Sequence, residues 1–135
     1  MNYETMKSTL KSYYSLKKSV EKIDEKIDQI EYEMANVRGI QYDRIPGQSN
    51  EQNRTERMLI LIEKKAVLEG DKLRIKELLG RLKKILVKEL ARLSDDTRNL
   101  LIRNAQGESL EKLAEEFGYT VSGLWRKLKK EVDDE

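Results

Sequence analysis

Four basic side chains close together near the C-terminus are the residues of this chain best suited to chemistry. No acidic residue lies between Gly118 and the last of them, and the four fall within five positions: Arg126, Lys127, Lys129 and Lys130. Guanidinium and ammonium groups at this density attract phosphates, because each can neutralise one negative charge. The expected chemistry is therefore the binding of a polyanion.

Helical spacing extends this basic group to a larger candidate site. A helix from about Val121 to Glu131 would turn Leu124 and Leu128 inward and leave its other face free. When such a helix enters the major groove of DNA, its first turn and outer face reach the base edges. The candidate DNA-binding residues are Thr120, Ser122, Trp125, Arg126, Lys127, Lys129 and Lys130.

The residue types in this set favour different contacts. The fork of Arg126 can grip guanine or phosphate, and the three lysines suit phosphate. Each residue also has a structural interpretation. Thr120 can cap the helix, Trp125 can pack against a neighbouring element, and the lysines can form a solvated face. Arg98 and Arg103 are further candidates for contact with the DNA backbone.

The residues before this helix complete a helix-turn-helix pattern. Ser94 and Ser109 are types that cap helix N-termini. Gly118 suits the turn because glycine adopts positive φ, and Ala114 is small enough for two steeply crossing helices to approach. We therefore expect three short helices after Ser94. Their expected core consists of Leu100, Leu101, Leu110, Leu113, Phe117, Tyr119 or Val121, Leu124 and Leu128.

The first two-thirds of the chain carries two heptad patterns typical of a coiled coil. Steps of three and four join Tyr13, Leu16, Val20, Ile23, Ile27, Ile30, Met34 and Val37. A second apolar pattern runs to about Leu93, after a loop expected at about 39–53 that contains Pro46 and Gly47. The predicted fold is all-α. A long antiparallel helical hairpin occupies 1–93, and a three-helix, helix-turn-helix DNA-binding domain occupies 94–135.

The apolar surface of the second long helix is wider than one partner helix would cover, which favours self-association into a dimer or tetramer. A monomeric amphipathic hairpin and an intermolecular coiled coil remain alternatives. The residues expected to hold subunits together are Val20, Ile23, Ile27, Ile30, Met34, Leu68, Ile75 and Leu82.

Composition removes most enzyme classes. The chain has no cysteine and no histidine, which excludes thiolate and imidazole zinc sites and Cys-His or Ser-His-Asp catalysis. Charged residues make up 39% of the 135 residues, and no stretch approaches the roughly 20 apolar residues of a membrane span. We expect no enzyme activity, metal, cofactor or membrane partner, and a cytoplasmic location.

The C-terminal run GESLEKLAEEFGYTVSGLWRKLKK resembles the helix-turn-helix of sigma-factor region 4. The longer layout, a charged coiled-coil N-terminus, a Pro-Gly loop and this motif, is similar to phage and prophage late-gene activators of the RinA/ArpU type. The resemblance implies promoter-proximal DNA binding and contact with host RNA polymerase in a bacterial cytoplasm.

The residues and the resemblance together favour a homo-oligomeric, sequence-specific transcriptional regulator of phage or prophage genes, acting as an activator. Two alternatives stay open. One is a small terminase-like recognition subunit for DNA packaging, which also joins a helix-turn-helix to coiled-coil helices. The other is a coiled-coil scaffold or adaptor that binds only protein.

Overall fold

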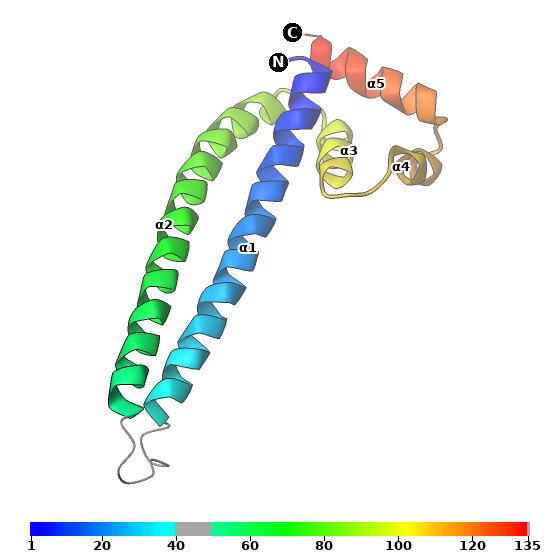
Figure 1. Ribbon diagram of the computed structural model, residues 1–135. Coiled ribbons are helices and arrows are strands. Elements are labelled where there is room, and N and C mark those ends of the chain that lie inside the picture. The colour runs from blue at the N-terminus through cyan, green and yellow to red at the C-terminus, as the bar shows by residue number, and fades with distance from the viewer. Residues whose placement is uncertain (40–49, 135) are drawn as a thin grey trace. The chain divides into compact units, whose positions relative to one another are not determined.

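The computed structural model describes residues 1–39 and 50–134, and these residues form helices and their connections (Figure 1). The helices are α1 (Tyr3–Gly39), α2 (Asn50–Ala91), α3 (Asp95–Ala105), α4 (Leu110–Phe117) and α5 (Val121–Asp133). The long helices α1 and α2 pack antiparallel, and three short helices follow. The predicted all-α class and the hairpin are confirmed.

Helical residues occupy both ends of the segment 39–53, which the sequence predicts as a loop. Gly39 still belongs to α1, and α2 already begins at Asn50. Residues 50–53 contain neither glycine nor proline, so nothing interrupts a helix whose extension adds one backbone hydrogen bond per residue. Pro46 and Gly47, on which the loop prediction depended, lie outside the described residues.

The chain divides into two compact units. The terminal unit combines Met1–Lys17 with Leu78–Glu135, and the hairpin unit is Lys18–Glu77. Each long helix therefore contributes one part to each unit. The terminal unit contains the three short helices together with residues that the sequence assigned to the coiled coil.

In the hairpin unit, the predicted heptad seam forms the contact between α1 and α2. Ile27, Ile30 and Leu61 are buried there. Two lysines of α2 occupy positions in this apolar seam, and both form ion pairs with carboxylates of α1. Lys65 Nζ lies 3.1 Å from Glu31, and Lys72 Nζ lies 2.5 Å from Asp24.

The terminal unit has one apolar core that all five helices build. Its buried members are Tyr3, Met6, Leu10, Leu86, Leu93, Leu100, Leu101, Leu113, Ala114, Leu124, Leu128 and Val132. The leucines predicted for the three short helices are present, but the first turns of α1 and the last turns of α2 complete the core. The three short helices thus pack on the first turns of α1 and the last turns of α2, and not only on one another.

One expected core position is filled differently. The sequence placed Tyr119 or Val121 in the core, and both are exposed. The ring of Tyr119 instead lies under the ammonium group of Lys127, with Nζ 5.3 Å from the ring centroid. The cation–π contact is favourable at the surface and offsets part of the cost of leaving the Tyr119 ring exposed.

The hydroxyl group of Tyr3 gives a stability prediction. Tyr3 is 1% exposed, and its hydroxyl has no hydrogen-bond partner among the described residues. A buried hydroxyl without a partner costs about 1–3 kcal/mol. We therefore expect Tyr3→Phe to raise the free energy of unfolding by about 1 kcal/mol in urea denaturation. Tyr32→Phe, at a well exposed site, is the control and should change it little; a Tyr3→Phe protein no more stable than wild type would contradict the prediction.

Candidate nucleic-acid interface

The helix α5 carries the basic residues, and its first turn is fixed by a cap. The hydroxyl of Thr120 accepts a hydrogen bond from the backbone N–H of Gly123, over 3.0 Å. A Cβ atom at Gly123 would lie 2.9 Å from that hydroxyl oxygen. Glycine at this position therefore avoids a steric clash with the capping side chain. The sequence allowed Thr120 to cap the helix or to contact a base, and the structure contains the cap. Thr120 is exposed at the start of α5.

The turn between α4 and α5 follows the predicted pattern. Gly118 has φ of 76°, in the left-handed region that glycine adopts without strain. The backbone N–H of Tyr119 then donates to the carbonyl of Ala114 over 2.8 Å and closes the end of α4. Ser109 caps the start of α4 through the N–H of Lys112. Local signals in the sequence therefore set the direction in which α5 leaves the turn.

The two faces of α5 have opposite environments. Leu124, Leu128 and Val132 are fully buried in the core of the terminal unit. The outer face leaves Trp125 37% exposed. The predicted site residues all lie at the surface: Thr120, Ser122, Trp125, Arg126, Lys129 and Lys130 are exposed, and Lys127 is half-buried. The leucines anchor the helix, and the candidate DNA-binding side chains project from it.

The four bases of α5 differ from the arginines of α3 in their partners. Within the described residues, no carboxylate forms an ion pair with Arg126, Lys127, Lys129 or Lys130. Lys127 nevertheless lies close enough to Glu131 to help lower the pKa of that carboxyl group.

The arginines of α3 both form ion pairs within the chain, and their contact with the DNA backbone stays a prediction. Arg103 donates to Glu108 through Nε over 2.5 Å and to Glu116 through Nη2 over 2.6 Å. These hydrogen bonds hold the pKa values of both carboxyl groups below their usual range. Arg98 pairs with Asp95 one turn earlier. Arg98 thus stabilises the first turn of α3, and Arg103 joins α3 to Glu116 of α4.

Cation–π contacts order two of the lysines. Lys129 Nζ lies 4.9 Å from the centroid of the Trp125 ring, and Lys127 makes the corresponding contact with Tyr119. Such contacts contribute about 0.5–1 kcal/mol at exposed sites, and they restrict flexible lysine side chains before any ligand arrives. Trp125 is therefore partly covered by Lys129, while the rest of its ring remains accessible.

The acidic end of α5 binds to the start of other helices. Asp133 Oδ1 accepts the backbone N–H of Tyr3 over 2.7 Å, and Glu131 accepts the N–H of Ser94 over 2.6 Å together with the hydroxyl of Thr97. Burial raises the pKa of Glu131, but the hydrogen bonds from Thr97 and Ser94 outweigh it, and the net pKa is lowered. These carboxylates stabilise the N-termini of α1 and α3, whose first amides lack helical partners.

Among the described residues, no helix is long and apolar enough to span a membrane, and no group of three acidic side chains is arranged to hold a metal ion. No protein-family model, curated protein or solved structure matches this chain.

The residues predicted to join subunits lie on α1 and α2. Ile27 and Ile30 are buried, and the remaining six are half-buried: Val20, Ile23, Met34, Leu68, Ile75 and Leu82. Their role between subunits stays a prediction. Sequence reasoning did not single out Leu59, Ile60 and Val67, which are exposed on α2. Ile60 and Val67 are seven residues apart, and this heptad spacing is the sequence signal that could have identified them as a second apolar stripe.

Proposed function

We propose that this chain is a sequence-specific DNA-binding regulator of transcription that acts as a homo-oligomer and uses α5 to read double-stranded DNA. One observation carries the proposal. Four basic side chains that form no ion pair with a carboxylate of the described residues lie on a helix whose opposite face is anchored by buried leucines. A rigid helix with one cationic face and a preceding turn suits insertion into the major groove.

The residues of α5 divide by the contact that each suits. Arg126 carries a planar fork and has no internal partner among the described residues, so it is the candidate for a guanine edge. The ordered lysines, Lys127 and Lys129, and the neighbouring Lys130 suit phosphates, which position a protein on DNA without reading its sequence. Ser122 and Trp125 lie on the exposed surface near Arg126 and suit contacts with neighbouring bases.

The resemblance of the C-terminal run to sigma-factor region 4, and of the layout to phage and prophage late-gene activators, favours activation of phage or prophage genes. It also favours host RNA polymerase as a partner. Self-association would present two copies of α5 to one operator, where half-sites lie about one DNA turn, roughly 34–36 Å, apart.

The double substitution Arg126→Ala and Lys129→Ala tests the site. We expect it to weaken binding to a selected genomic fragment by about ten- to a hundredfold, since a lost base contact is worth about 1–3 kcal/mol. The slope of log affinity against log salt should also fall by roughly one for each lost phosphate contact. Electrophoretic mobility shift at several salt concentrations measures both quantities.

Lys83→Ala with Lys84→Ala is the matched control, because it removes the same charge from exposed positions of α2. It should change DNA affinity far less than the α5 pair. Equal losses in both doubles would mean that only net charge matters, and would refute the site. Failure of the wild-type protein to bind any fragment at low salt would support a scaffold that binds only protein.

A further inference from the structure

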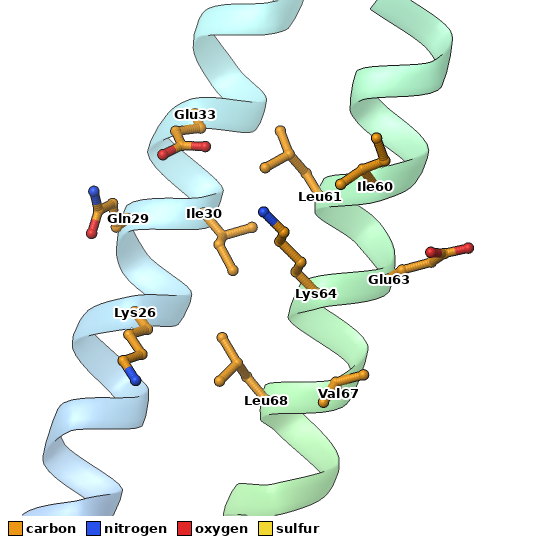
Figure 2. Close-up of a pocket in the computed structure, with 10 residues that line it drawn as sticks. All are labelled: Lys26, Gln29, Ile30, Glu33, Ile60, Leu61, Glu63, Lys64, Val67 and Leu68. Atoms are coloured by element: carbon orange, nitrogen blue, oxygen red, sulfur yellow. The ribbon is translucent and has the colours of Figure 1, made fainter.

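A groove of about 650 Å³ runs between α1 and α2 in the hairpin unit (Figure 2). Ile30 of α1 and Leu61 and Leu68 of α2 point between the two helices and form its apolar floor. Ile60 and Val67 stand on the α2 side and are 52% and 63% exposed. Apolar side chains left in water along such a groove mark an interaction surface, because covering them removes apolar area from solvent.

Both helices carry a lysine and a carboxylate one heptad apart in the stretch that contains this groove. On α1, Lys26 and Glu33 lie seven residues apart with Gln29 between them, and all three line the groove. On α2, Lys64 lines the groove, and Asp71 lies seven residues further along, outside the groove lining and paired with Arg74. Residues seven apart occupy the same face of a coiled-coil helix. Each helix therefore has a positive group at one end of this stretch and a negative group at the other.

The ion pairs that join the two helices show which residues of α1 and α2 lie at the same height along the hairpin. Lys65 pairs with Glu31, and Lys72 pairs with Asp24. In antiparallel helices these pairs place Gln29 level with Val67. Gln29 lies near the midpoint of Lys26 and Glu33, and Val67 near the midpoint of Lys64 and Asp71. The two charge patterns are thus centred at the same level of the groove.

We infer that this groove is the surface on which a second copy of the chain docks, antiparallel and related by a twofold axis near Gln29 and Val67. The inference rests on the self-association in the proposed function and assigns it a surface. A twofold axis brings each surface against itself in the reverse direction. Lys26 then meets Glu33 of the second copy, and the two Val67 side chains meet at the axis. Lys64 comes level with Asp71 of the second copy, a carboxylate that also pairs with Arg74 of its own helix.

The self-matching pattern favours a second copy over an unrelated partner. An unrelated helix could match any arrangement of charges, so it would not require both helices to be self-complementary about one level. The opposing apolar floors and the exposed Ile60 and Val67 would together form the centre of a four-helix bundle, in which helix pairs pack along such stripes.

The substitution Val67→Asp tests the apolar centre of this interface. Val67 is exposed in a single chain, so the hairpin should fold as before, with unchanged helicity by circular dichroism. We expect sedimentation to give twice the chain mass of 15.9 kDa for the wild type and the single-chain mass for the variant. Val87→Asp, the same change at a valine that is 59% exposed, is the matched control and should keep the wild-type mass.

A charge exchange tests the antiparallel direction. Lys26→Glu would place two carboxylates opposite each other twice per dimer and should raise the dimer dissociation constant about tenfold, since each exposed pair contributes up to about 1 kcal/mol. Adding Glu33→Lys restores opposite charges across the axis in the reverse sense and should return the constant to the wild-type value. A single substitution without effect, or a double without rescue, would overturn the arrangement.

Mass measured without DNA separates this inference from the proposed function. A wild-type monomer that still binds DNA would overturn the docking surface and leave the DNA-binding proposal standing. A dimer that responds to Val67→Asp but binds no DNA would support the surface and defeat the proposed function. Eight or more chains per particle would overturn the twofold dimer and favour the ring of a DNA-packaging subunit.

Discussion

Met6→Asp should unfold the terminal unit and abolish the DNA binding proposed for α5, although α5 begins far later in the chain. Met6 is 0% exposed and belongs to the same core as Leu113, Leu124 and Leu128. A carboxylate at this position would have to be desolvated without a partner, at a cost of several kcal/mol. That cost is comparable with the whole stability of a small domain, about 5–15 kcal/mol. Urea denaturation followed by circular dichroism measures the loss.

Ser8→Asp is the control for this prediction, because it introduces the same carboxylate two residues later at an exposed position of α1. Its effect should stay within about 0.5 kcal/mol of wild type, as for most surface substitutions. If Met6→Asp and Ser8→Asp were equally stable, the start of α1 would not belong to the core of the short helices. Hydrogen exchange in α3–α5 would locate the damage directly.

The contribution of Met6 shows where sequence reasoning stopped. The steps of three and four that begin at Tyr13 continue backward through Leu10, Met6 and Tyr3, so the buried stripe of α1 could have been followed to its first turn. Periodicity tells which face of a helix is buried, but not which element covers it. The structure covers that face with α3–α5.

The helix ends were far more predictable than the core partners. Ser94, Ser109 and Gly118 occupy the cap and turn positions that the sequence indicated. These features depend on hydrogen bonds between residues three or four apart, which the local sequence determines. The contacts of Glu131 with Ser94, and of Asp133 with Tyr3, join distant segments and left no local signal.

The candidate site was predictable in its residues but not in its electrostatic state. The sequence identified the four bases of α5, and it also offered Arg103 as a backbone contact. Only the packing of α3 against α4 places Glu108 and Glu116 around Arg103 and leaves Arg126 without such a partner among the described residues. Charge counts alone cannot separate a base that stabilises the fold from one that is free for a ligand.

Leu128→Ala is expected to lower the free energy of unfolding by about 2–5 kcal/mol, because it removes a fully buried side chain and leaves a cavity. Leu128 lies on the inner face of α5, opposite the proposed contacts. The loss should therefore appear in urea denaturation as a lower midpoint. At low temperature, where the variant remains folded, its affinity for DNA should stay close to wild type.

Substitution of the outer face should have the opposite result. Lys130→Ala removes an exposed side chain and should leave the stability within about 0.5 kcal/mol of wild type. It should nevertheless weaken DNA binding and reduce its salt dependence by roughly one unit of slope. If the folded Leu128→Ala protein lost affinity as strongly as the Lys130→Ala protein, the two faces of α5 would not have separate roles. A single helix can anchor itself with one face and bind with the other only if these two losses are independent.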